Sequence, residues 1–388
     1  GFNKRSAEEF WETGVKFAPL LKGGLYRKWY GNNWFVITYD LDGYRKLSTV
    51  GNKLPSREDY FRPYISWNRI STRMAFRYCE NGCLFESASL VAFAEDKKQM
   101  LLALAFANSV LAKNEMQLIN PTTNMLSGYV DALTLPRMSA EDTSDCIDLA
   151  NECVELSKED WDENETSWDY KRNPLLGRSC SLKDAFVDYQ RECEKRFQSV
   201  KANEERINKI LVSAAGLLEE FDCAVDEKDV SIRLADRETE VKALLSYAVG
   251  CMFGRYSLDI PGLLCSDAVL PTDSYISFIP DMDNVIPVTD EEYLEDDIIL
   301  RLCEWLKKAF GEETLEENLD YIAQSLNIRG NFSREIIRNY LLNDFIADNT
   351  KTYQRKPIYL LFDSGKENGC KALIYLHRYN ADTIGNLR

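Results

Sequence analysis

The side chains best suited to chemistry lie between Arg57 and Arg77, where arginines alternate with aromatic residues. The five arginines of this segment are Arg57, Arg62, Arg69, Arg73 and Arg77. A guanidinium group can pair with a phosphate or with the edge of guanine, and an aromatic ring can stack on a base. The segment therefore predicts contact with nucleic acid.

A second segment, from Lys22 to Tyr44, repeats this mixture and adds amide side chains. The paired donor and acceptor of an amide match the edge of adenine in the major groove. Together the two segments give the candidate DNA-binding residues Arg27, Lys28, Asn32, Asn33, Arg57, Arg62, Asn68, Arg69, Arg73 and Arg77.

Each of these assignments has a structural alternative. The arginines can stack on the protein's own rings or pair with nearby carboxylates such as Asp59. The run Gly31-Asn32-Asn33 is also typical of a turn. Trp29 and Trp67 could stack on a displaced base, but a tryptophan in a strand is more often part of the core, which we expect for Trp34 and Trp67.

The formal net charge of −16 is unfavourable for DNA binding. The charge is, however, unevenly distributed along the chain. Residues 1–137 carry 18 basic and 13 acidic side chains, whereas residues 138–388 carry 29 and 50. Phosphate contacts supply most of the affinity for DNA, so we place the duplex on the basic first part. The acidic remainder is expected to repel a duplex.

The pattern of apolar residues predicts an α+β fold with an α+β first domain, a long helical spacer and a C-terminal helical domain with a β-hairpin. We expect the corresponding domains at residues 1–137, 138–255 and 256–388. In the first, short runs rich in aromatic and β-branched residues predict strands at 34–38, 64–67, 74–77 and 90–93, with one buried helix over 97–113.

The later domains show clearer periodicity. A stripe of apolar residues predicts one long helix from Ser181 for about ten turns, and another helix covers 236–253. Capping patterns predict helices that start at Thr289, Thr314 and Ser333. The runs 357–362 and 370–376 flank a turn and predict a β-hairpin.

The two N-terminal segments resemble the target-recognition region of PglX-type adenine-specific DNA methyltransferases of the bacterial BREX phage-defence systems. Three later blocks, 236–259, 289–298 and 355–379, share the resemblance, which therefore covers most of the chain. The stretch 124–136 also resembles the short strand that ends target-recognition domains. The resemblance implies double-stranded DNA as a partner and S-adenosylmethionine as the cofactor of the parent enzyme.

The catalytic motif of such an enzyme is missing from this sequence. An adenine-N6 methyltransferase needs Asn or Asp followed by Pro-Pro-aromatic, whereas Asn120-Pro121 and Asn173-Pro174 lack the second proline and the aromatic. A glycine-rich cofactor turn is also lacking. We therefore expect the non-catalytic, C-terminal portion of a larger methyltransferase, with no catalytic, cofactor-binding or metal residues, and with the missing N-terminal methyltransferase domain as a partner.

Two other functions remain open from the sequence. The acidic surface is compatible with a protein-interaction scaffold for other defence-system proteins, and a sensor of a phage product is the third alternative. The longest apolar run is too short to span a bilayer, so we predict a cytoplasmic protein without a membrane partner.

Overall fold

The computed structural model describes residues 4–50, 54, 56–80, 82–264, 270–290, 294–365, 371–383 and 385. These residues form two compact units. Unit 1 comprises residues 1–161 and 195–233, and unit 2 comprises 162–194 and 234–388. The fold class is α+β, as the sequence predicts. The predicted spacer, 138–255, is divided between the units, and the three-part division by function stays a prediction.

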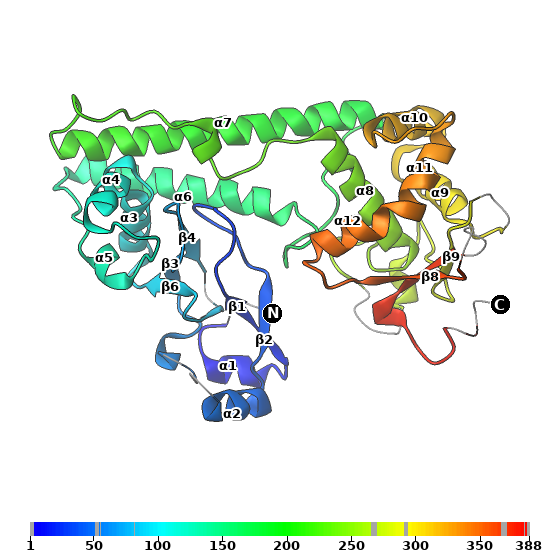
Figure 1. The fold of residues 1–388 in the computed structure, drawn as a ribbon, viewed down its shortest axis with the longest axis horizontal. Coiled ribbons are helices and arrows are strands. Elements are labelled where there is room, and N and C mark those ends of the chain that lie inside the picture. Colours follow the sequence, from blue (N-terminus) through cyan, green and yellow to red (C-terminus); the bar gives the residue numbers. More distant parts are fainter. Residues whose placement is uncertain are drawn as a thin grey trace. The chain divides into compact units, whose positions relative to one another are not determined.

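Unit 1 contains two three-stranded sheets (Figure 1). One has the order β2-β1-β5 and the other β4-β3-β6. Their strands are β1 (Phe17–Leu21), β2 (Phe35–Thr38), β3 (Tyr64–Asn68), β4 (Phe76–Cys79), β5 (Leu84–Phe85) and β6 (Ser89–Ala92). Strand β3 pairs antiparallel with both of its neighbours, so it is the centre of the second sheet. Four of these strands confirm the strands predicted from sequence.

Helices cover the second sheet and one end of the first. Helix α3 packs on β3 and β4, and Figure 1 shows α1 and α2 at the opposite end of unit 1 from α6. The helices of this unit are α1 (Ala7–Glu12), α2 (Leu41–Thr49), α3 (Lys97–Ala107), α4 (Val110–Ile119), α5 (Ser127–Asp131) and α6 (Ala140–Asp162), with the 3-10 turns η1 (Arg57–Asp59) and η2 (Glu227–Asp229).

Two sequence predictions in unit 1 are wrong in detail. The single helix expected over 97–113 is two helices, because the Asn108 side chain bonds to the backbone of Phe76 and Ser109 caps α4. The strand expected over 124–136 is reduced to one bridge between Asn124 and Ile70. Helix α5 follows instead, because the next backbone N–H groups return to the carbonyl of Leu126.

The core of unit 1 contains Trp29 and Trp67, each 1% exposed, packed with side chains from α3, α4, α6 and α7. The core position predicted for Trp67 is thus confirmed, and its indole N–H donates to the carbonyl of Met125 at 2.8 Å. Trp34 is half-buried, with its ring centroid 5.7 Å from that of Trp161. The buried indoles of Trp29 and Trp67 are therefore not available to stack on a base.

The predicted long helix is α7 (Leu182–Ala214), which has 33 residues. It contributes its first part to unit 2 and its second part to unit 1. Its apolar stripe continues through both parts, with Leu182 and Tyr189 in one core and Val200 and Leu211 in the other. The spacing of the stripe therefore predicts the helix, whereas its division between two cores becomes visible only in the structure.

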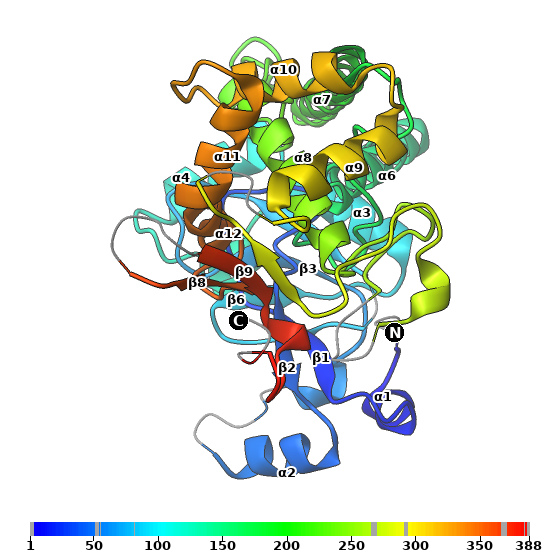
Figure 2. The same cartoon turned by 90° about the vertical axis from the view of Figure 1, so that its right-hand side faces the viewer.

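Unit 2 packs a helical cluster with one small sheet (Figure 2). Its helices are α8 (Arg237–Met252), α9 (Ile298–Phe310), α10 (Leu315–Ser325), α11 (Ser333–Asn343) and α12 (Phe345–Thr352), with the 3-10 turns η3 (Thr272–Ser274) and η5 (Leu376–Arg378). The sheet has the order β7-β9-β8, from β7 (Val285–Pro287), β8 (Tyr359–Asp363) and β9 (Lys371–Tyr375). The predicted hairpin is confirmed as the antiparallel pair β8–β9, while most of its turn lies outside the described residues.

One predicted helix start in unit 2 is wrong. Helix α9 begins at Ile298 rather than near Thr289, because Asp297 caps it by accepting from the N–H of Ile299 at 2.9 Å. The same carboxylate pairs with the Arg338 guanidinium at 2.7 and 2.8 Å, so the start of α9 is tied to α11. The residue Glu292 of the predicted cap lies outside the described residues.

Candidate nucleic-acid interface

Arg27, the first of the ten candidates, lies inside unit 1. Its guanidinium pairs with the fully buried Asp160 at 2.8 Å and donates to the carbonyls of Tyr30 and Ser157 at 2.6 and 2.8 Å. A side chain on the adjacent Gly31 would collide with it, because a Cβ there would lie 2.5 Å from the Arg27 Nε. Arg27 is therefore a packing residue, and we correct its assignment to DNA.

Lys28 is also internal, at 5% exposure. Its ammonium donates to the Glu204 carboxylate of α7, which also accepts from the Trp29 indole at 2.7 Å. Burial acts to lower the pKa of Lys28, but the charge and hydrogen bond of Glu204, together with Tyr26 and Cys153, outweigh burial, so the pKa is raised. Lys28 is thus a buried cation held by a buried carboxylate, and it does not lie on the surface of the unit where a duplex would be met.

Asn32 and Arg77 complete this interior cluster. Asn32 is 2% exposed and donates to the carbonyl of Leu25 at 2.9 Å. Arg77 is 1% exposed and donates to Asn68 Oδ1 at 2.9 Å, while Asn68 Nδ2 donates to the carbonyl of Gly24 at 2.7 Å. Burial lowers the pKa of Arg77 to about 10. Each end of the Asn68 amide thus has one partner inside the protein, and its assignment as a base reader stays a prediction.

The exposed candidates form two groups at opposite ends of β3. Arg57 and Arg62 precede the strand, and Arg69 and Arg73 follow it. Arg69 lies seven positions after Arg62, and at roughly 3.3 Å per residue this corresponds to up to about 23 Å. The structure therefore does not bring all the arginines of this segment to one site.

At the first end, the cations have partners within the protein. Arg62 pairs with Asp59 and lies over the Phe93 ring at 4.9 Å, as the structural alternative anticipated. Arg57 donates to the Tyr44 hydroxyl at 3.1 Å. Asn33, the remaining amide candidate, is half-buried.

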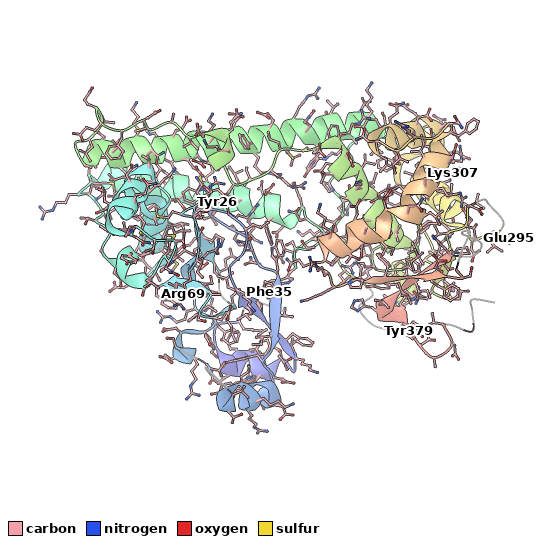
Figure 3. All side chains as sticks on the ribbon, viewed as in Figure 1. Tyr26, Phe35, Arg69, Glu295, Lys307 and Tyr379 are labelled. Atoms are coloured by element: carbon pink, nitrogen blue, oxygen red, sulfur yellow. The ribbon has the colours of Figure 1, made fainter. Side chains whose placement is uncertain are left out.

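At the second end, Arg69 lines an open groove of about 460 Å³ in unit 1. Figure 3 labels Arg69 in this part of the unit. The groove is lined by Lys22, Gly23, Gly24, Asn68, Arg69, Ile70, Ser87, Ala88 and Asn124. We call this surface the DNA-groove, after the function proposed for it below. It has two exposed cations and no carboxylate among its described lining residues.

The floor and wall of the DNA-groove are set by backbone contacts. Met125 N–H donates to the carbonyl of Arg69 at 2.7 Å, and Ser71 N–H donates to that of Thr123 at 3.0 Å. These bonds join two loops that are far apart in sequence. Gly24 permits a close approach on the other side, since a Cβ there would lie 2.6 Å from the Asn32 Cγ.

Sequence reasoning missed several residues of this groove. Lys22, Ser87 and Asn124 were not candidates, because they lie outside the arginine-aromatic pattern or at its border. The signal available for Lys22 was its position directly before Gly23-Gly24. For Asn124 no local signal exists, since its place follows from the bridge to Ile70.

Arg73 lies beside the groove but faces other partners. Its guanidinium lies over the Tyr26 ring at 3.4 Å from the centroid and pairs with Asp229 at 2.5 Å. The Arg73 side chain is still 42% exposed. It is thus an exposed cation that already has a carboxylate.

The asparagines of the two Asn-Pro pairs are both buried, Asn120 at 7% and Asn173 at 1% exposure, so neither presents an exposed amide to a base. Asn120 Oδ1 accepts from the N–H and hydroxyl of Thr122 at 3.0 and 2.9 Å, and its Nδ2 donates to Asn124. Asn173 is 1% exposed and accepts from the N–H of Leu175 at 3.0 Å. Both amides stabilise their own turns.

Within the described ranges, no group of three or more His, Cys, Asp or Glu side chains is arranged to hold a metal ion. Across the same residues, none of the helices has both the length and the apolar character needed to cross a bilayer.

Comparison with known proteins gives two long matches. The chain is 39% identical over 387 residues to the adenine-specific methyltransferase PglX of Lacticaseibacillus casei (strain Zhang), covering 95% of this chain and 32% of that protein. It is 33% identical over 404 residues to the adenine-specific methyltransferase BrxX of Escherichia coli O9:H4 (strain HS), covering 96% and 33%. No family model matches the chain.

These matches confirm the resemblance stated from the sequence, for nearly the whole chain. The chain spans about a third of the length of the curated relatives it matches. It is therefore similar to one region of these methyltransferases.

Proposed function

We propose that this chain supplies the DNA-recognition part of an adenine-N6 DNA methyltransferase of a BREX-type phage-defence system, and that it does not itself transfer a methyl group. The names of the two relatives support the methyltransferase connection. Because the matched region is about a third of each relative, S-adenosylmethionine and the catalytic residues are assigned to a part of the longer protein that this chain does not include.

The charge of the DNA-groove supports the DNA-binding part of the proposal. Lys22 and Arg69 are exposed on it, and its described lining contains no carboxylate to neutralise them. Cations without carboxylate partners can neutralise phosphates and release counterions. The side chains of Asn124 and Ser87 add donors and acceptors that can meet base edges.

The test is duplex binding measured by fluorescence anisotropy over a range of salt concentrations. Affinity of the unchanged protein should fall steeply with salt, and the double variant Lys22→Glu/Arg69→Glu should bind more weakly, with the magnitude of its salt slope lower by about two, one for each lost phosphate contact. The matched control, Lys195→Glu/Lys209→Glu, makes the same charge change on exposed positions of α7.

A control variant that weakens binding as much as the groove variant would show that net charge, rather than the DNA-groove, governs association. Absent or salt-independent binding by the folded protein would overturn the proposal.

A protein-interaction role is the second candidate, favoured by the outer face of α6. Exposed carboxylates recur there at helical spacing, at Glu141, Asp148, Glu152, Glu155 and Glu159. Such a stripe is complementary to a basic protein surface. Salt-dependent binding to a component of the defence system, with no binding to duplex, would favour this function.

A further inference from the structure

Unit 1 contains a cavity of about 200 Å³ that the proposed function does not use. Residues from the two loops that wall the DNA-groove also line it, together with α3, α4, the second part of α7 and the segment 224–229. The lining of the cavity includes the polar side chains of Tyr26, Lys28, Arg73, Lys113, Glu204 and Asp229. Figure 3 labels Tyr26, on the segment between β1 and β2.

Lys28 is one of the buried polar residues that line the cavity, at 5% exposure. An ammonium has three N–H donors. Among the described residues, the Lys28 ammonium makes one hydrogen bond, to Glu204, which also lines the cavity. The cavity can therefore supply an acceptor for the remaining donors. A buried cation of this kind calls for an acceptor, from water or from a ligand.

The mouth of the cavity is also cationic. Arg73 lies over the Tyr26 ring and pairs with Asp229, and Lys113 lies 3.6 Å from the same carboxylate. Three cations and two carboxylates therefore line the site, which leaves a net positive charge. An electron-rich or anionic ligand is favoured over a cation.

The size and walls of the cavity define the rest of the ligand. An apolar cavity of about 150 Å³ accommodates benzene, so about 200 Å³ accommodates one planar six-membered ring with polar substituents. Met74, Met116, Met125 and Val225 supply apolar contacts on which a ring can pack.

We propose that this cavity binds one pyrimidine nucleotide, with a ring carbonyl accepting from Lys28 and the phosphate beside Arg73 and Lys113. The nucleotide is either a free molecule or an unstacked nucleotide of a DNA strand that lies in the adjoining DNA-groove. The free form does not depend on the proposed function, whereas the DNA-borne form does.

The experiment is calorimetric titration of the full chain with deoxythymidine monophosphate, deoxyadenosine monophosphate and inorganic phosphate. The pyrimidine nucleotide should bind more tightly than the adenine nucleotide, whose base has no ring carbonyl to accept from Lys28 and is larger than one six-membered ring, and than phosphate, which lacks the ring. A parallel titration uses a duplex with one unpaired thymidine and the fully paired duplex, to separate the two sources of the ring.

Variants locate the binding site. Ala224 is an exposed lining residue, so Ala224→Trp should block the mouth without disturbing the core, and binding should weaken about tenfold or more, as expected for loss of a ring-stacking site. Arg73→Ala should also weaken binding, while Arg62→Ala should not. Arg62 is a matched control because it too pairs with a carboxylate and lies over a ring, but it does not line the cavity.

The outcomes distinguish the two proposals. Binding of the free nucleotide that is lost in Ala224→Trp and kept in Lys22→Glu/Arg69→Glu supports the cavity whatever the fate of duplex binding. A preference for the unpaired thymidine that both variants abolish supports the DNA-borne nucleotide. Absence of any preference for the pyrimidine nucleotide or the unpaired thymidine, or binding that Ala224→Trp leaves unchanged, overturns the inference.

Discussion

Two polar regions of unit 1 look alike in sequence and differ in structure: the interior cluster around Arg27, Lys28 and Arg77, and the DNA-groove with Lys22 and Arg69. In the interior cluster, Arg27 meets Asp160 and Lys28 meets Glu204, while Arg77 bonds to an amide. In the DNA-groove the described lining offers the cations no carboxylate. A basic residue next to aromatics is therefore not by itself a sign of contact with DNA, because burial and the partners inside the protein differ between the two regions.

The largest predicted effect lies in the interior cluster. Glu204→Ala should lower the free energy of unfolding by about 3–5 kcal/mol, because it leaves the buried Lys28 ammonium and the Trp29 indole without their acceptor. Glu152→Ala, on the exposed face of α6, should stay within about 0.5 kcal/mol. Chemical denaturation measures both, and similar losses in the two variants would contradict the assignment of Lys28 to the interior.

The interior cluster should also make the free energy of unfolding depend on pH. The pKa of Lys28 is raised in the folded state, so the unfolded chain loses this proton first. The stability that the Lys28–Glu204 pair contributes should be fully present below about pH 10.4 and lost as the pH rises through the folded-state pKa. Chemical denaturation across this pH range should show that the Lys28→Met/Glu204→Gln variant lacks this loss of stability, and an unchanged pH dependence would contradict the assignment.

A smaller effect on duplex binding should distinguish the arginines at the two ends of β3. Arg69→Ala should reduce the magnitude of the salt slope of duplex binding by about one, whereas Arg57→Ala, at the other end, should change it less. Neither change should alter the free energy of unfolding by more than about 0.5 kcal/mol, because both side chains are exposed. Equal losses of affinity would show that the duplex extends along the whole strand.

The elements that were predicted well have strong local patterns. The apolar stripe of α7 and the two runs of the β8–β9 hairpin are visible from spacing alone. Strand β1 was missed because Pro19, which cannot donate a ladder hydrogen bond, lies in its middle. The short helix α5 replaced an expected strand because a bridge at Asn124 ends the pairing after one residue.

The candidate site was harder to predict than the fold. The partners that bury Arg27 and Lys28 lie 133 and 176 positions away in sequence, so no local pattern connects them. Two of the candidates predicted from the sequence, Asn68 and Arg69, line the DNA-groove. The other groove residues come together through loop contacts such as that between Met125 and Arg69.

The most direct test of the central claim is a structure of this chain bound to duplex DNA, in which each contact can be sorted into backbone or base contact. The account predicts phosphate oxygens within about 3 Å of the Arg69 guanidinium and the Lys22 ammonium, with the interior cluster unchanged. A duplex bound elsewhere on the protein, with the DNA-groove open to solvent, would contradict it.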